Sequence, residues 1–137
     1  MAGTVSLPRA LPPAAAVALL VVAVLGRTIR VEVHGASMAP GLMVGDRVVA
    51  LRDLPARRGD VVVARDPRQP SRLLVKRVAA VHDDGGVDLA GDAPEASTDS
   101  RTFGTIPAAS VLARVVWRYW PPARRGRVSG ARHRPSR

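Results

Sequence analysis

Short apolar runs of strand length, separated by turn-forming residues, limit this chain to few folds. Valine-rich segments lie at 48–51, 61–64, 72–82, 87–90 and 113–120, and clusters of Gly, Pro and Asp divide them. Short strands at intervals of about 8–12 residues predict a mainly β domain, built as a compact coiled sheet or barrel-like structure. The chain has only four aromatic residues, so we expect a core of Val, Leu, Ala and Ile.

An uncharged segment of 17 residues, 10–26, precedes the first strand. Its prolines suit the first turn of a helix, and that helix would be roughly 25 Å long, near the lower limit for crossing a bilayer. A membrane anchor, a cleaved signal peptide and a buried helix all fit this composition. We favour a single transmembrane anchor, because Arg27 and Arg30 follow at once and a strand starts by Val31, which leaves no spacer for cleavage.

Charge is concentrated at the carboxyl end of the chain. The net charge is +10, but 123–137 holds six arginines and no acid, and the other 122 residues carry +4. A nucleic-acid-binding domain would present a folded basic face with interleaved aromatics, so no specific nucleic acid is expected. We therefore predict an N-terminal segment at 1–9, the anchor at 10–26, a folded domain at 28–122 and a disordered basic tail at 123–137.

Ser37 occupies a tight connection between two predicted strands. An alternating run ends at Gly35, and Pro40 and Gly41 follow the serine before a second turn at Gly45-Asp46. Reactive side chains are commonly held on such connections of a rigid scaffold. A serine hydroxyl is a weak nucleophile, so this site requires a base that can accept its proton.

Lys76 is the candidate base, and it is the only lysine among 21 basic residues. Arginine stays protonated in proteins, whereas lysine can lose its proton in an apolar pocket. Lys76 stands in the middle of the apolar run 73–81, which favours burial. The alternative is a lysine whose amine reaches solvent at a strand edge. Ser-Lys pairs are a known variant of the catalytic triad.

Three motifs of the chain resemble those of the type I signal peptidases, which are Ser-Lys endopeptidases. They are Gly35-x-Ser37-Met38-x-Pro40-x-Leu42-x-x-Gly45-Asp46, then Lys76-Arg77, then Gly91-Asp92-x-x-x-x-Ser97-x-Asp99-Ser100-Arg101. The resemblance covers residues 30–121. With 14 positions between Lys76 and Gly91, the chain is similar to the short, single-anchor form without an extra β domain.

The resemblance implies a role for each matching residue. Ser37 would attack the scissile carbonyl and Lys76 would take its proton. Four further residues would support the site: Ser97, Asp99, Arg101 and Arg77. Ser97 would orient the lysine, and Arg77 is expected to pair with Asp99. Shallow pockets for the small residues of an Ala-x-Ala cleavage site would be formed by Met38, Ala39, Leu42 and the apolar strands. No cofactor and no metal are implied. Gly35 stands where some family members carry a serine that donates to the oxyanion.

Other site chemistries fit the residues less well. His34 and His82 could serve as bases, but neither lies in a motif that supplies the orienting carboxylate of a Ser-His-Asp triad. His133 lies in the tail. The acidic residues Asp83, Asp84 and Asp88 crowd a hairpin tip and lack the spacing of a calcium loop. We therefore expect a solvated turn there rather than a metal site.

Three other functions remain as alternatives. The self-cleaving repressors of the DNA-damage response share Ser-Met, Gly-Asp and Lys-Arg motifs, but they lack the Ser-x-Asp-Ser-Arg loop and carry a DNA-binding domain. The maturation protease that trims the N-terminal extension of nickel superoxide dismutase is similar in size and motif order. A non-enzymatic adaptor could use the basic tail at a membrane surface or on nucleic acid.

The resemblance implies a cell-membrane protein that cleaves the signal peptides of preproteins outside the cytoplasm. The absence of cysteine fits an extracytoplasmic domain. The distribution of arginines opposes this orientation, because Arg27 and Arg30 outnumber Arg9 on the side that would face outward. The oligomeric state is left open by the sequence.

Overall fold

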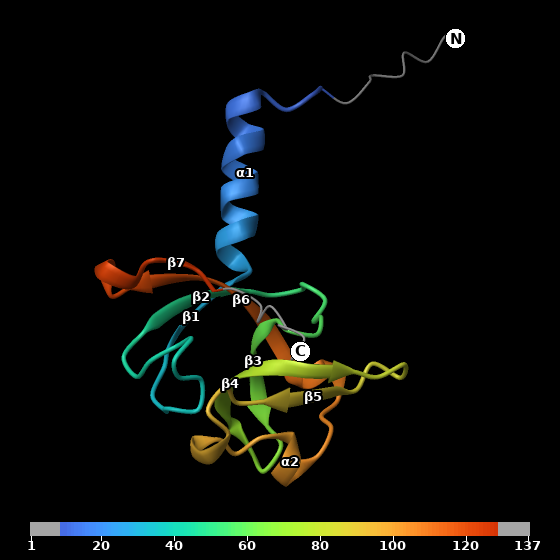
Figure 1. Ribbon diagram of the computed structural model, residues 1–137. Coiled ribbons are helices and arrows are strands. Elements are labelled where there is room, and N and C mark those ends of the chain that lie inside the picture. Colours follow the sequence, from blue (N-terminus) through green and yellow to red (C-terminus); the bar gives the residue numbers. More distant parts are fainter. Residues whose placement is uncertain (1–8, 129–137) are drawn as a thin grey trace, which may run out of the picture.

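The computed structural model describes residues 9–128, in which one helix stands on an antiparallel β domain (Figure 1). In chain order the elements are α1 (Pro13–Gly26), β1 (Thr28–Glu32), β2 (Arg47–Leu51), β3 (Val61–Asp66), β4 (Gln69–Val81), β5 (Val87–Ala90), α2 (Ser100–Phe103), β6 (Val111–Trp120) and β7 (Gly126–Arg127). Single 3-10 turns lie at Pro94–Ala96, Ala108–Ser110 and Pro122–Arg124.

The strands of the described residues form one sheet with the order β1-β2-β6-β3-β4-β5, and β7 pairs with β6. Every pairing is antiparallel, and the register shifts within several of the pairs. Such shifts increase the local twist, which allows a small sheet to coil. Strand β6 inserts between β2 and β3, so the last long strand joins the two halves of the domain. The predicted mainly β domain is confirmed.

The coiled sheet encloses two apolar clusters, and β3 contributes to both. Val61 and Val63 pack in the first cluster, and Val62 and Ala64 pack in the second. Successive residues of a strand point to opposite faces, so a strand that is buried on both faces must be apolar throughout. The buried apolar side chains are Val, Leu, Ala and Ile with one methionine, Met38, which agrees with the expected aliphatic core.

Helix α1 projects away from the sheet, and none of its residues is buried (Figure 1). It has 14 residues and begins at Pro13, because a proline at the first helical position loses no helical hydrogen bond. Leu19, Leu20 and Val22 are among its large exposed apolar side chains. Within residues 9–128, no helix has the combined length and apolar character of a membrane span.

The first part of the predicted tail is ordered, which corrects the expectation of disorder from residue 123. β7 pairs with β6 through Trp117 and Arg127, and Val128 packs against the first apolar cluster. Arg124 holds this segment in place through an ion pair of 3.1 Å with the buried carboxylate of Asp46. The remaining tail residues, 129–137, and most of the N-terminal segment, 1–8, lie outside the described residues.

Candidate active site

The turn that carries Ser37 is fixed at both ends by hydrogen bonds. Val33 donates to the Asp46 carbonyl (2.8 Å) and accepts from the Gly45 amide (2.7 Å), which closes the loop between β1 and β2. The Ser37 carbonyl accepts a hydrogen bond from the Ala93 amide (2.8 Å), which links the turn to the distant 91–101 segment. The hydroxyl is therefore presented by a turn with little conformational freedom.

Lys76 is buried in β4, where it pairs with Val62 of β3 and keeps only 5% of its surface exposed. Burial lowers the pKa of its amine, because the protonated form loses hydration. The carboxylate of Asp99 opposes this shift, and the nearby guanidinium groups of Arg72 and Arg101 lower the pKa further. The environment of the amine thus favours the neutral form more than water does.

A chain of hydrogen bonds leads from Lys76 to a buried carboxylate. Lys76 Nζ lies 3.1 Å from Ser97 Oγ, and the Ser97 hydroxyl donates to Asp99 Oδ2 over 2.9 Å. Arg101 donates to both oxygens of Asp99, at 2.9 and 2.8 Å, and the Gly91 amide donates to Oδ2 at 3.0 Å. Chiefly because of Arg101, the pKa of Asp99 is held well below its usual range, so this carboxyl is ionised.

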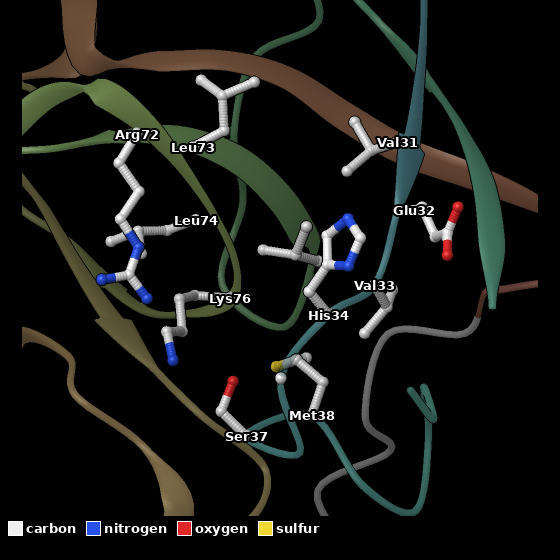
Figure 2. Close-up of a pocket in the computed structure, with 12 residues that line it drawn as sticks. Val31, Glu32, Val33, His34, Ser37, Met38, Arg72, Leu73, Leu74 and Lys76 are labelled. Carbon is white, nitrogen blue, oxygen red and sulfur yellow. The ribbon is translucent and has the colours of Figure 1, made fainter. Parts of the chain in front are cut away.

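Ser37 and Lys76 line the same cleft, which has a volume of about 270 Å³. Figure 2 shows the Ser37 hydroxyl and the Lys76 amine directed toward the same space between the turn that carries Ser37 and β4. The side chain of Ser37 makes no hydrogen bond to any other residue in 9–128. The structure thus brings together Ser37, Lys76 and Ser97 with the bracing residues Asp99 and Arg101.

Arg77 does not pair with Asp99, which corrects the sequence expectation. Its guanidinium makes two hydrogen bonds of 2.7 Å to the carboxylate of Asp92 and donates to the Gly59 carbonyl. Neighbouring residues of a strand point to opposite faces, so Arg77 points away from the side of β4 on which Lys76 contacts Ser97. Its contacts tie the 91–101 segment to the loop before β3.

The three predicted pocket residues have different positions. Met38 is buried and lines the cleft. Leu42 is fully buried in the first apolar cluster and does not line the cleft. Ala39 is half-buried and also lies outside the cleft lining. The strands supply further apolar lining as expected, through Val31 of β1 and through Leu73, Leu74 and Val75 of β4, and Val33 adds to it just after β1.

The histidines also differ from expectation in one respect. His82 has a carboxylate partner that no motif indicated, since its Nε2 lies 2.9 Å from Asp88 Oδ2. It does not line the cleft, whereas His34 does line it as an exposed residue. His133 lies outside the described residues. Among residues 9–128 no cluster of His, Asp and Glu has the arrangement of a metal site.

The sequence predicted no role in the site for Gly91 or for Arg72. Gly91 lies so close to the site that a Cβ there would stand 2.2 Å from Ser97 Oγ and 2.7 Å from the Ser37 carbonyl oxygen. Arg72 lines the cleft on the same face of β4 as Lys76. A period-two alternation from Lys76 would have indicated the position of Arg72, but the chain has too many arginines for one to stand out.

Sequence comparison places this arrangement in a known family. The family described as signal peptidase, peptidase S26, matches residues 5–85, which is more than half of the chain. The chain belongs to the signal peptidase family, peptidase S26. The match includes Ser37 and Lys76 but ends before Ser97, whose contact with Lys76 is seen in the structure.

Several relatives in the signal peptidase family are subunits of mitochondrial proteases. The chain is 34% identical over 117 residues to the mitochondrial ATP-independent inner membrane protease subunit 1a of Arabidopsis thaliana, covering 66% of this chain and 70% of the relative. It is 32% identical over 120 residues to the mitochondrial inner membrane protease subunit 2 of Schizosaccharomyces pombe, covering 70% and 67%. For subunit 1 of Homo sapiens the identity is 31% over 110 residues, covering 64% and 66%.

Proposed function

We propose that this protein is a membrane-bound serine endopeptidase that removes N-terminal signal peptides from exported preproteins through a Ser37–Lys76 dyad. The observation that carries the proposal is the placement of the only lysine, buried and with a lowered pKa, in the cleft that also holds Ser37. Membership of the signal peptidase family supports the same reaction class.

The hydrogen bonds around Lys76 suit a general base. The Ser97 hydroxyl donates its hydrogen bond to Asp99, so toward Lys76 its oxygen can only accept an N–H. A neutral amine held in this way keeps its lone pair free for the proton of Ser37. Asp99 and Arg101 therefore act as positioning residues, because they fix the direction of the Ser97 hydroxyl.

In the proposed reaction Ser37 Oγ attacks the scissile carbonyl carbon while Lys76 takes the hydroxyl proton. The C–N bond then breaks, Lys76 returns the proton to the leaving amine, and an acyl-enzyme ester remains on Ser37. Water attacks this ester with Lys76 as base, which releases the signal peptide carboxylate and restores the serine. The Ser37 amide is a donor for the oxyanion, and Gly35 provides no side-chain donor.

An extended peptide fits the cleft because both of its walls are sheet edges. β1 pairs only with β2, and β4 pairs with β5 only from Arg77 onward, so β4 residues 73–75 pair only with β3. A substrate strand can bind free backbone groups on these edges in the manner of β-augmentation. The apolar walls and the small volume suit the small residues of an Ala-x-Ala site.

The apolar segment 10–26 is proposed to attach the protein to the membrane, with the β domain on the extracytoplasmic side. All of α1 faces outward, and its leucine and valine side chains have no partner in the sheet. Burial of such side chains in lipid would remove apolar surface from water at roughly 25 cal/mol per Å². The relatives named as inner membrane proteases support a membrane location.

The decisive experiment is cleavage of a preprotein with an Ala-x-Ala processing site by the full chain in detergent or vesicles. The wild type should release the signal peptide at that site, as identified by mass spectrometry, and Ser37→Ala should not. Truncation after Val128 separates this function from that of a non-enzymatic adaptor. A peptidase should keep its activity without the tail, whereas an adaptor that binds through the tail should lose its binding. Equal turnover by wild type and Ser37→Ala would refute the proposed function.

A further inference from the structure

We infer that Arg72 is a specificity-determining residue that selects preproteins with a carboxylate side chain close to the scissile bond. This inference rests on the proposed function, since it assigns a substrate preference to the same cleft. Arg72, Leu74 and Lys76 alternate on one face of β4, and all three line the cleft. Figure 2 shows the Arg72 guanidinium extending along the wall that also carries the Lys76 amine.

The guanidinium of Arg72 makes no direct ion pair within the described part of the chain; its charge contributes to the lowered pKa of Asp66, but that carboxylate is bound by Arg68. Arg72 is exposed, and no hydrogen bond or ion pair joins it to any residue in 9–128. The neighbouring arginines are already engaged, because Arg68 binds Asp66 at 2.9 Å and Arg101 binds Asp99 at 2.8 Å. Arg72 is therefore available to a ligand in a way that these two are not.

The cleft itself does not neutralise this charge. Its lining includes one carboxylate, Glu32 on the opposite wall, and that group lies 3.6 Å from Arg47. Figure 2 shows the Glu32 carboxylate turned away from Arg72. The positive charge of Arg72 acts on the Lys76 amine, because its electrostatic repulsion lowers the pKa of that amine. A substrate carboxylate in this space would pair with an arginine that has no direct ion pair to another residue in 9–128.

Strand geometry limits where that carboxylate can lie. Residues of a strand rise about 3.3 Å each, so the Cα of Arg72 is roughly 13 Å from that of Lys76 along β4. A substrate strand beside β4 has the same rise per residue. The long side chain of Arg72 can bring its guanidinium closer to the scissile bond than the Cα distance suggests. We therefore place the selected Asp or Glu within about four residues of the scissile bond.

The test compares matched preproteins that carry Asp or Asn at each of the four positions on either side of the cleavage site. For the wild type we expect Asp to raise kcat/KM about tenfold over Asn at one position or two adjacent ones, mainly through KM. Arg72→Glu should reverse this preference and favour Lys at that position, and Arg72→Gln should remove it. Arg52→Glu makes the same charge change at an exposed residue outside the cleft lining and should keep the preference for Asp.

The outcomes separate this inference from the proposed function. Cleavage of the Asn substrates by the wild type, with no gain from Asp at any position, would overturn the role of Arg72 and leave the peptidase intact. A preference for Asp that survives in folded Arg72→Glu or Arg72→Gln would overturn it as well. Failure of the wild type to cut any member of the panel would instead refute the proposed function and, with it, this inference.

Discussion

Ser97 Oγ lies 3.1 Å from Lys76 Nζ, although the two residues are 21 positions apart in the chain. The contact depends on Asp99, which accepts the Ser97 proton and is itself held by Arg101 and by the Gly91 amide. The lysine is thus oriented by a polar network that belongs to a different segment from the strand that carries it.

Replacement of Ser97 by alanine should lower kcat about 10- to 100-fold without unfolding the domain. The substitution removes the hydrogen bond that orients Lys76, but it leaves the apolar core intact. Steady-state cleavage and circular dichroism check both parts. Ser71→Ala is the matched control, since Ser71 is exposed on β4, the strand that carries Lys76, and this variant should behave like wild type. Unchanged kcat in Ser97→Ala would reduce Ser97 to a turn residue.

Lys76→Arg should be as inactive as Lys76→Ala, with losses of about 1000-fold or more. Arginine keeps the charge and nearly the length of lysine, but it cannot release a proton to act as a base. Adding Ser37→Ala to Lys76→Ala should reduce the rate little further, because each change already removes the shared step. A folded Lys76→Arg enzyme with most of its activity would contradict the dyad and reopen His34 as the base.

The pH profile of kcat/KM should rise along an acidic limb that reports the pKa of Lys76, below that of an ordinary lysine. Only the neutral amine can accept the Ser37 proton, so activity falls as pH drops through this pKa. Asp99→Asn removes a negative charge that raises the pKa of Lys76, so its acidic limb should move to lower pH while the maximal rate falls. Asp83→Asn, at the exposed hairpin tip, should leave the limb in place. A shift of the Asp99→Asn limb to higher pH would contradict the assignment.

Gly91→Ala should lower both thermal stability and activity. Its Cβ would stand 2.2 Å from Ser97 Oγ and 2.7 Å from the Ser37 carbonyl oxygen, so the two site segments must separate. Overpacking of this kind costs about 1–3 kcal/mol of unfolding free energy. Gly35→Ala is the control for stability, because a Cβ at Gly35 meets no atom within 4 Å. Calorimetry that finds equal melting temperatures for the two variants would show that the segments are not tightly packed.

Segment 10–26 should keep the full chain in the membrane fraction after alkaline carbonate extraction. The expectation follows from its uncharged sequence and from the outward-facing side chains of α1. Immunoblotting of the pellet and supernatant measures the outcome. A matched chain with Leu19 and Val22 changed to Asp should be extracted, since charges are costly at the bilayer centre. Complete extraction of the wild type would favour the maturation protease of nickel superoxide dismutase as the better analogue.

The sequence by itself determined the features that depend on neighbours along the chain. Alternating apolar residues and Gly-Asp turns predicted the strands, because side-chain period and turn chemistry are local properties. The lone lysine in an apolar run and the serine on a tight turn identified the candidate dyad through composition and motif. The resemblance to signal peptidases also indicated that Ser97 would orient Lys76, before any contact was known.

Only the tertiary structure decided which side chains meet. Arg77 binds Asp92 rather than Asp99, because Lys76 and Arg77 point to opposite faces of β4 and the 91–101 segment passes both. Arg72 lines the cleft, whereas Leu42 packs in the core, and pairing between distant strands sets both positions. In an antiparallel sheet whose neighbours are not consecutive, such as β2–β6 and β3–β6, these contacts arise from long-range register, which no local pattern of residues encodes.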